Sequence, residues 1–179
     1  MTDEQLVEGC VKKQALAQKT LYDKYSRKML GVCLRYASST DEAQDILQDG
    51  FIKVFDKIEA FNAKGSLEGW IRRVMVNTAL DNFRKNKKHM NQTDVDDVKY
   101  LLKADNFVVE SLEAKALLKI IQTLPTGFRT VFNLYAIEGY SHKEIGVMLD
   151  VSEGTSKSQY SRARAYIQKI LEKENITTR

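Results

Sequence analysis

The chain has 179 residues, and its 28 Lys and Arg against 24 Asp and Glu give a formal net charge of +4. This length fits one domain or two small ones, and 43% hydrophobic with 29% charged residues indicates a chain that buries a core. Two cysteines, Cys10 and Cys33, argue against a disulfide scaffold or a four-ligand zinc site and suit a reducing cytoplasm. A run of about 18 apolar residues is missing and the N-terminus is acidic, which argues against a membrane span and a secretory signal.

Helical periodicity begins at the N-terminus, and nine glycines with one proline leave room for long helices. The first helical region spans about 3–37, with a break near Lys13. Its later part carries one apolar face, made of Leu21, Tyr25, Met29, Val32, Cys33 and Tyr36. Any of Ser38, Ser39 and Thr40 can end this region and cap the next helix.

The second predicted helix, 41–58, has the most regular apolar stripe in the chain. The stripe consists of Ala43, Ile46, Leu47, Gly50, Phe51, Val54, Phe55 and Ile58. On the opposite side Asp41, Asp45 and Asp49 stand four apart, along one edge. The helix dipole accounts for Asp41, but Asp49 lies two turns in. This edge is therefore either a protein-docking surface or a solvated face, and without a histidine it is a poor metal site.

A loop over 59–65 follows, and Ser66 is the expected N-cap of a helix that runs to about Lys87. Inward positions on this helix are Leu67, Trp70 or Ile71, Val74 and Thr78. Its outward positions and the residues that follow are basic, with Arg72, Arg73, Arg84, Lys85, Lys87 and Lys88 against one acid, Asp81. Residues 89–106 lack periodicity and are acidic in balance, which is typical of a linker.

The remaining chain predicts helices over about 109–123, 125–137, 142–149 and 152–173. Pro125 suits a first helical position, Ser141 and Glu144 have capping-box spacing, and Ser152 can cap the last helix. The last two helices form a helix-turn-helix, in which Ile145, Leu149 and Val151 bury against Tyr160, Ala163 and Ile167.

The final helix has the composition of a DNA-reading helix. No acid occurs between Gly154 and Leu171, where Lys157, Arg162, Arg164 and Lys169 are the cations. Its first half presents short donors, an amide and cations: Gly154, Thr155, Ser156, Lys157, Ser158, Gln159, Ser161 and Arg162. Such side chains suit base edges and phosphates, which favours DNA recognition over a plain helical hairpin.

Catalysis has little support in the sequence. Gly65, Gly69 and Gly139 are isolated, so no phosphate loop is formed, and the two histidines, His89 and His142, lie apart from the cysteines and the acidic edge. A lone histidine is more typical of the surface than of a metal site. We therefore expect no enzyme activity, cofactor or metal.

Together these segments resemble a known family, the bacterial sigma factors. Residues 45–51 (DILQDGF) and 69–73 (GWIRR), with Asn77, Asp81 and Arg84, are similar to sigma region 2. Residues 124–132, 139–145, 152–158 and 161–164 are similar to region 4. The short length, with a linker in place of region 3, points to the extracytoplasmic-function (ECF) group of the sigma-70 family. The resemblance implies an all-α chain of two small helical domains joined by a flexible linker: region 2 at 1–90, the linker at 91–108 and region 4 at 109–179.

The resemblance also implies partners and contact residues. A sigma factor binds core RNA polymerase and directs promoter-specific initiation. The docking helix, which meets a coiled coil of the largest subunit, is expected to use Asp45, Gln48 and Asp49. The −10 element is expected to meet Asn62, Lys64, Gly65, Ser66, Arg73 and Asn77, with one base flipped into a pocket of the 61–67 loop. The −35 element is expected to meet Lys157, Ser158, Ser161 and Arg162.

Some positions differ from the family pattern or have two interpretations. Many relatives carry Val at Ser156 and Arg at Gln159, so the promoter motif is not predicted. Trp70 is either core or a DNA contact, and Gly69 replaces an aromatic residue of primary sigma factors, which suggests weaker intrinsic melting. An anti-sigma partner is expected by resemblance only. Two rival functions are a one-component DNA-binding regulator, which would need a ligand pocket in 1–90, and an inhibitory adaptor that binds polymerase but no promoter.

Overall fold

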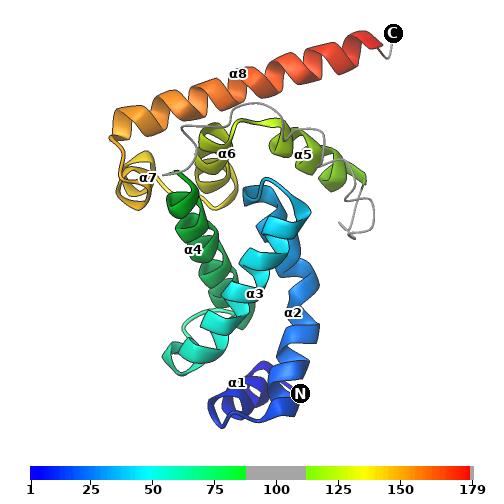
Figure 1. Cartoon of the computed structure of the whole chain (residues 1–179), viewed down its shortest axis with the longest axis vertical. Coiled ribbons are helices and arrows are strands. Elements are labelled where there is room, and N and C mark those ends of the chain that lie inside the picture. Colours follow the sequence, from blue (N-terminus) through cyan, green and yellow to red (C-terminus); the bar gives the residue numbers. More distant parts are fainter. Residues whose placement is uncertain (88–111, 178–179) are drawn as a thin grey trace. The chain divides into compact units, whose positions relative to one another are not determined.

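The computed structural model describes residues 1–87 and 112–177, and these form two compact helical units (Figure 1). The first unit contains α1 (Asp3–Val11), α2 (Ala15–Tyr36), α3 (Thr40–Lys57), a short 3-10 helix η1 (Ile58–Ala60) and α4 (Leu67–Lys87). The second contains α5 (Leu112–Thr123), α6 (Thr126–Phe132), the π-helical turn η4 (Asn133–Ile137), α7 (His142–Leu149) and α8 (Glu153–Thr177). The described residues contain no strand, and the all-α prediction is confirmed. The predicted linker, 91–108, lies outside the described residues.

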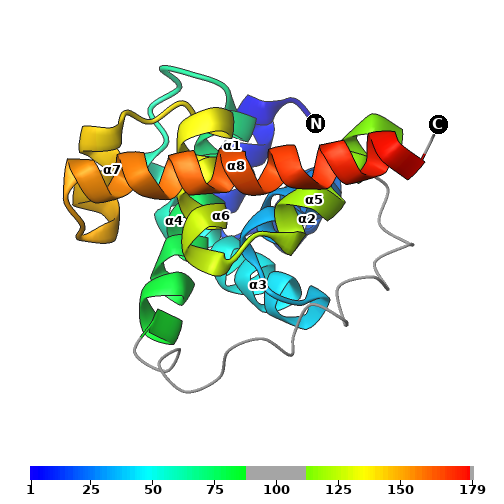
Figure 2. The ribbon, with the colours of Figure 1, turned by 90° about the horizontal axis from the view of Figure 1, so that it is seen from above.

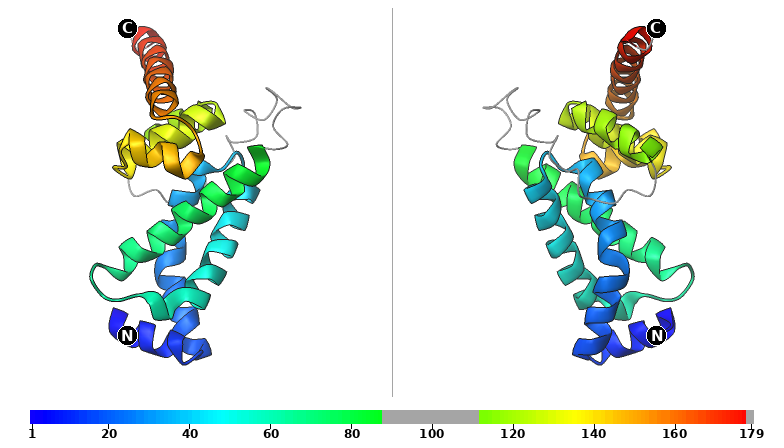
Figure 3. Two further views of the ribbon diagram at one scale, coloured as in Figure 1. Left: turned by 90° about the vertical axis from the view of Figure 1, so that its left-hand side faces the viewer. Right: turned by 90° about the vertical axis from the view of Figure 1, so that its right-hand side faces the viewer.

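The core of the first unit lies where α2, α3 and α4 pack on one another, as the two views of Figure 3 show. Every residue of the predicted α2 face is buried, and of the α3 stripe only Phe55 remains half-exposed. Of the two alternatives on α4, Ile71 lies in the core with Leu67, Met75 and Leu80, while Trp70 is half-buried. Burial raises the pKa of the Cys33 thiol to about 12, so this thiol stays protonated and unreactive at neutral pH.

Polar contacts fix the helices of this unit against one another. Ser39 is the cap that α3 uses, since its Oγ accepts from the Glu42 backbone N–H at 3.1 Å. The Glu42 carboxylate in turn accepts from Asn82 Nδ2 at 2.6 Å and from Asn86 Nδ2 at 3.1 Å. The start of α3 is therefore tied to the end of α4, which limits rotation of α3 about its axis.

The second unit departs from the predicted helices in two places. Pro125 is the N-cap of α6, with extended backbone (ψ 143°), rather than its first helical residue. The predicted helix 125–137 is α-helical only to Phe132 and then widens into η4, where the Glu138 N–H donates to the Asn133 carbonyl at 2.9 Å. The wider turn buries both Asn133 and Leu134 and leaves Tyr135 exposed. A three- or four-residue period cannot reveal such a step.

The helix-turn-helix follows the predicted layout. Ser141 and Glu144 form the capping box of α7, and the Ser152 Oγ accepts from the Thr155 N–H at 3.0 Å at the start of α8. The turn between them passes through Asp150 in a left-handed conformation (φ 55°). Figure 2 shows α8 as one long helix, and it packs against α6 and α7. None of the helices in the described ranges is both long and apolar enough to cross a membrane.

We predict that Gly146→Ala destabilises the second unit. A Cβ on Gly146 would lie 2.7 Å from the Val151 carbonyl oxygen, which belongs to the backbone of the turn and cannot move aside cheaply. Overpacking of this kind costs about 1–3 kcal/mol. The matched control is Gly31→Ala in α2, where a Cβ meets nothing within 4 Å and the gain in helix propensity is about 0.5–1 kcal/mol. Urea unfolding should move the two variants in opposite directions, and equal shifts would contradict the close approach.

Candidate functional site

The outer face of α3 carries an exposed acidic surface, defined here as Asp45, Gln48 and Asp49. All three side chains are exposed, as predicted, and no described residue gives them a hydrogen bond or ion pair. The nearby cation Lys53 turns toward α4 instead, where its Nζ lies 3.0 Å from Asp81. The charge of this surface is therefore not neutralised within the described part of the unit.

An apolar side chain continues the acidic surface. Ile52 is 54% exposed and follows Gln48 and Asp49 by four and three residues, so it lies on the same face of α3. On α2, Tyr22 is 41% exposed and packs on Phe51 with ring centroids 4.7 Å apart. Exposed apolar groups beside unpaired acids are typical of protein-binding surfaces, where an apolar centre is surrounded by polar groups. The sequence alone did not single out Ile52, because its exposure depends on the exact rotation of α3.

The loop before α4 presents the predicted small polar residues to solvent. Asn62, Lys64, Gly65 and Ser66 are all exposed. The Asn62 Oδ1 accepts from the Lys64 N–H at 3.2 Å, and Ala63 between them has φ 57°. Ser66 caps α4, since its Oγ accepts from the Gly69 N–H at 3.0 Å. A Cβ on Gly65 would meet nothing within 4 Å, so the backbone there is open to close approach.

The structure brings this loop together with the two predicted residues on α4. Ser66, Trp70, Arg73 and Asn77 are spaced by four, three and four residues, so they share one face of the helix. Arg73 and Asn77 are exposed. Trp70 is half-buried because its ring packs on Phe61 at the start of the loop, with centroids 5.9 Å apart. Trp70 therefore supports the loop through Phe61. It is neither a fully buried core residue nor a fully exposed side chain, the two environments that its alternative predicted roles require.

On α8 the four predicted contact residues, Lys157, Ser158, Ser161 and Arg162, are all exposed. Lys157 makes an ion pair with Glu153 at 3.3 Å, one turn earlier. Arg164 lies over the Tyr160 ring at 6.0 Å. The outer face thus combines hydroxyl donors with cations, and the helix N-terminus adds a positive dipole end.

Two residues that the sequence assigned to this outer face lie inside the unit. Ser156 is 0% exposed, and its Oγ is 2.9 Å from Nδ1 of His142. Gln159 is half-buried, and its Oε1 is enclosed without a hydrogen-bond partner among the described residues. It faces Gly127 of α6, where a Cβ would be 3.5 Å from that oxygen. The prediction of Ser156 as an exposed donor is wrong, and Gln159 is only partly exposed, because α8 turns these positions toward α6 and α7.

His142 belongs to a cluster of rings rather than to the free surface. Its imidazole stacks on Tyr135 with centroids 4.2 Å apart and planes 9° from parallel, and it meets Tyr160 at 5.7 Å. Tyr160 also stacks on Phe132 at 6.0 Å. Tyr160 is half-buried here, in line with its predicted packing role. The cluster joins α6, η4, α7 and α8, and no sequence period connects its members.

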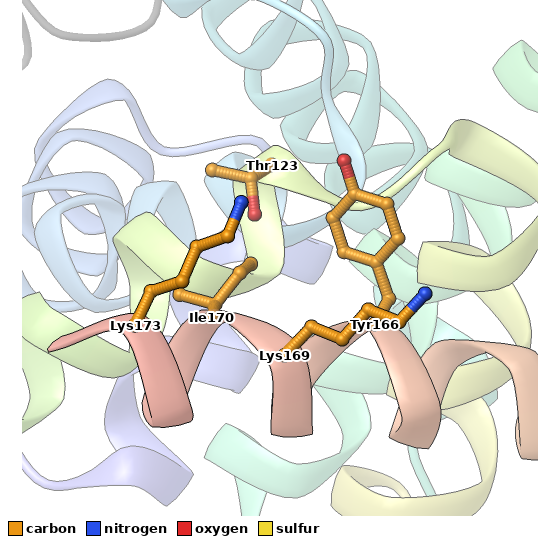
Figure 4. Close-up of a pocket in the computed structure, with 5 residues that line it drawn as sticks. All are labelled: Thr123, Tyr166, Lys169, Ile170 and Lys173. Atoms are coloured by element: carbon orange, nitrogen blue, oxygen red, sulfur yellow. The ribbon is translucent and has the colours of Figure 1, made fainter. Parts of the chain in front are cut away.

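A groove on the second unit lies between the end of α5 and α8 (Figure 4). Thr123, Tyr166 and Ile170 form its lining, with the lysines Lys169 and Lys173 beside them. It holds no acid pair and no thiol that could act as a nucleophile or base. The described ranges also contain no group of three His, Cys, Asp or Glu side chains that could hold a metal ion.

Comparisons with known proteins place a sigma-70 region in each of the two units. Residues 21–89 match the family model for Sigma-70 region 2, and residues 114–167 match the model for Sigma-70, region 4. The RNA polymerase sigma-H factor of Pseudomonas aeruginosa is 31% identical over 183 residues, covering 95% of this chain and 94% of that protein. The ECF RNA polymerase sigma-E factor of Haemophilus influenzae is 28% identical, with 94% of each chain covered.

Two solved structures share the fold. The first is the sigma factor RpoE with the anti-sigma factor NepR from Bartonella quintana, at a TM-score of 0.51 and 22% identity, covering 86% of this chain and 96% of that one. The second is CnrH with the cytosolic domain of CnrY, at 0.50 and 20% identity, covering 95% and 97%.

We predict a pH effect from the capping box of α7. The Ser141 N–H donates to the Glu144 carboxylate at 2.7 Å and lowers the pKa of Glu144 below its ordinary value of 4.5. A lowered pKa stabilises the fold above that value, and the contribution is lost as the pH falls through the folded pKa. Glu144→Gln keeps the capping geometry but cannot titrate. Between about pH 6 and pH 3, the parent should therefore lose more unfolding free energy than the variant. Parallel losses would show that Glu144 contributes no pH dependence.

Proposed function

This chain belongs to the ECF group of the sigma-70 family, and from this premise we propose how its two units divide the work of initiation. The protein binds core RNA polymerase and directs promoter-specific transcription initiation. We assign residues 1–90 to polymerase binding and the −10 element, 91–108 to a linker, and 109–179 to the −35 element. The observation that carries this division is that the two matched regions fall on separate compact units.

Polymerase binding is assigned to the acidic surface together with Ile52, which continues it along α3. Unpaired carboxylates need no internal ion pair to be broken before they meet a basic partner, so their attraction is available for docking. Burial of Ile52 adds an apolar contact that salt does not screen. The proposed partner is the coiled coil of the largest polymerase subunit. It would present basic side chains around an apolar position.

We predict that Asp49→Lys weakens binding to core polymerase. A like-charge contact at a docking surface costs on the order of 2 kcal/mol, which corresponds to about a 30-fold loss of affinity. The side chain is exposed, so the fold should be unaffected. Glu4→Lys, an equal charge change at an exposed position on α1, is the control. Titration of labelled core enzyme measures both. Unchanged affinity for the Asp49 variant would remove this helix from the interface.

Recognition of the −10 element is assigned to the 61–66 loop and the adjoining face of α4. Asn62, Lys64 and Ser66 supply donors, and Gly65 allows the backbone to approach. Arg73 and Asn77 extend the surface about two and about three turns along α4 from Ser66. The Phe61–Trp70 contact holds the start of the loop against α4, which supports a loop shape that is set before DNA arrives. A preformed binding surface lowers the cost of holding a flipped base.

Recognition of the −35 element is assigned to the outer face of α8. Ser158, Ser161 and Arg162 lie within one turn of each other and are exposed. Lys157 is the proposed phosphate contact, which would exchange Glu153 for the DNA backbone. Of the two departures from the family pattern, Ser156 is buried and Gln159 is half-buried, so we assign both to the packing of α8 rather than to direct base contacts.

We predict different behaviour for two cations on α8. Arg162→Ala should remove a base contact, costing about 1–3 kcal/mol and relaxing preference at one −35 position. Lys169 lies two turns further along α8. Lys169→Ala should therefore weaken binding to all −35 sequences alike and lower the salt dependence of the affinity by about one unit of slope. Both variants are measured as holoenzyme on −35 variants across a salt series. An equal loss for every sequence would make Arg162 a phosphate contact.

Initiation itself is the test of the whole assignment. Core enzyme with this chain should give run-off transcripts from a subset of a randomised promoter pool, and neither component alone should do so. A one-component regulator would fail to bind core enzyme, and an inhibitory adaptor would bind it without yielding transcripts. We propose no catalytic activity for the chain itself. The proposed localisation is the cytoplasm, without direct insertion of the chain into a membrane.

We also propose an anti-sigma factor as a regulatory partner. The support is that one structure with the same fold, the sigma factor RpoE, was solved with the anti-sigma factor NepR, and that the other, CnrH, was solved with the cytosolic domain of CnrY. The exposed acidic surface and Ile52 are accessible for it in the free unit. Competition between a captured anti-sigma factor and core enzyme would test this assignment.

A further inference from the structure

The contact between Ser156 and His142 is unusual for its place on α8. Ser156 directly precedes Lys157 on the helix assigned to DNA reading, yet it is fully buried. Its Oγ lies 2.9 Å from Nδ1 of His142, and the two residues are 14 positions apart. This hydrogen bond joins the first residue of α7 to the fourth residue of α8.

The ring of His142 is itself held in place. It stacks on Tyr135 within 9° of parallel, and Tyr160 packs against both rings, 4.5 Å from Tyr135 and 5.7 Å from His142. The stacking holds the plane of the ring, and the hydrogen bond to Ser156 Oγ accounts for the edge on which Nδ1 lies. Ser156 and Tyr160 are one turn apart on α8, so the hydrogen bond and the ring contact act on the same side of the helix.

The rest of the buried face of α8 offers little to fix its rotation. Among the α8 side chains that the structure describes, only Ser156 and Ala163 are fully buried, each 0% exposed. Side chains this small allow close approach but do not interlock with the grooves of a neighbouring helix. A hydrogen bond, in contrast, depends steeply on distance and angle. Rotation or sliding of α8 would break the bond to His142 before it opened an apolar contact.

We infer that His142 and Ser156 are a pair of positioning residues that set the rotation of α8 about its axis. The pair thereby directs Ser158, Ser161 and Arg162, on the opposite side of the helix, toward the base edges. Its effect is on discrimination between −35 sequences, since base contacts depend on the direction of a side chain more than phosphate attraction does. The inference rests on the proposed reading of the −35 element by α8.

The test separates the hydrogen bond from the ring contact. His142→Phe keeps a ring on Tyr135 but removes Nδ1, while His142→Asn keeps a polar atom near Nδ1 but removes the ring. Ser156→Ala removes the other partner. Holoenzymes made with each full-length variant are compared by the ratio of affinities for the preferred −35 element and its single-base variants.

We expect His142→Phe and Ser156→Ala each to lower this ratio about tenfold, within the range of one lost base contact. The double variant should fall no further than either single variant, because the two residues act through one contact. His142→Asn should retain more discrimination than His142→Phe. The salt slope should stay unchanged in all of them, since no phosphate contact is removed.

A purely structural role is distinguished by a control in the same unit. Ile121→Val removes a methylene from a fully buried side chain of α5 and lowers stability without removing the His142–Ser156 hydrogen bond or a ring of the cluster. The inference is wrong if this control lowers the ratio as much as Ser156→Ala, or if His142→Phe keeps the parent ratio or exceeds His142→Asn. If the parent holoenzyme itself fails to distinguish −35 variants, the assignment of α8 to that element fails, and this inference fails with it.

Discussion

The burial of one face of α3 between α2 and α4 is the constraint on which the first unit depends. An amphipathic helix with its apolar stripe enclosed has one orientation, so its remaining face must meet solvent or a partner. Glu42 and Lys53, both directed toward α4, hold that orientation through Asn82 and Asp81. The unpaired carboxylates and Ile52 are then on the outside because the core requires it. The proposed docking surface and the core are two sides of the same helix.

In the second unit the long helix α8 is oriented without a broad apolar stripe. This helix carries a mostly polar sequence, and its fully buried described side chains are a serine and an alanine. Close approach and directed contacts replace a broad apolar stripe. Gly146 lets the backbone of the turn come near α7, and the rings of Phe132, Tyr135, His142 and Tyr160 surround the helix start. The orientation of α8 depends on a few polar and aromatic contacts. We therefore expect single substitutions among these buried residues to change the direction of the side chains on its outer face.

Much of the fold could be predicted because it follows from local pattern. The stripe of α3, the caps at Ser66, Ser141 and Ser152, and the break at Lys13 each depend on residues within one or two turns. The exposure of the predicted contact residues follows from the same periodicity, while their roles stay predictions. Features that depend on contacts between residues far apart in the sequence could not be predicted from this local pattern. The π-helical turn has no period to detect, and the burial of Ser156 depends on a histidine in another helix.

The ion pair between Glu153 and Lys157 has a consequence for how the protein meets DNA of any sequence. Glu before Lys at this spacing is the favourable orientation, worth about 0.2–0.5 kcal/mol. A phosphate that approaches Lys157 must displace the carboxylate of Glu153, which stays close because it is on the same helix. The chain thus carries its own weak competitor for the nucleic-acid backbone. The same cost applies to every phosphate that Lys157 meets, so it shortens residence on arbitrary duplex as well as on a promoter. It leaves the protein freer to search.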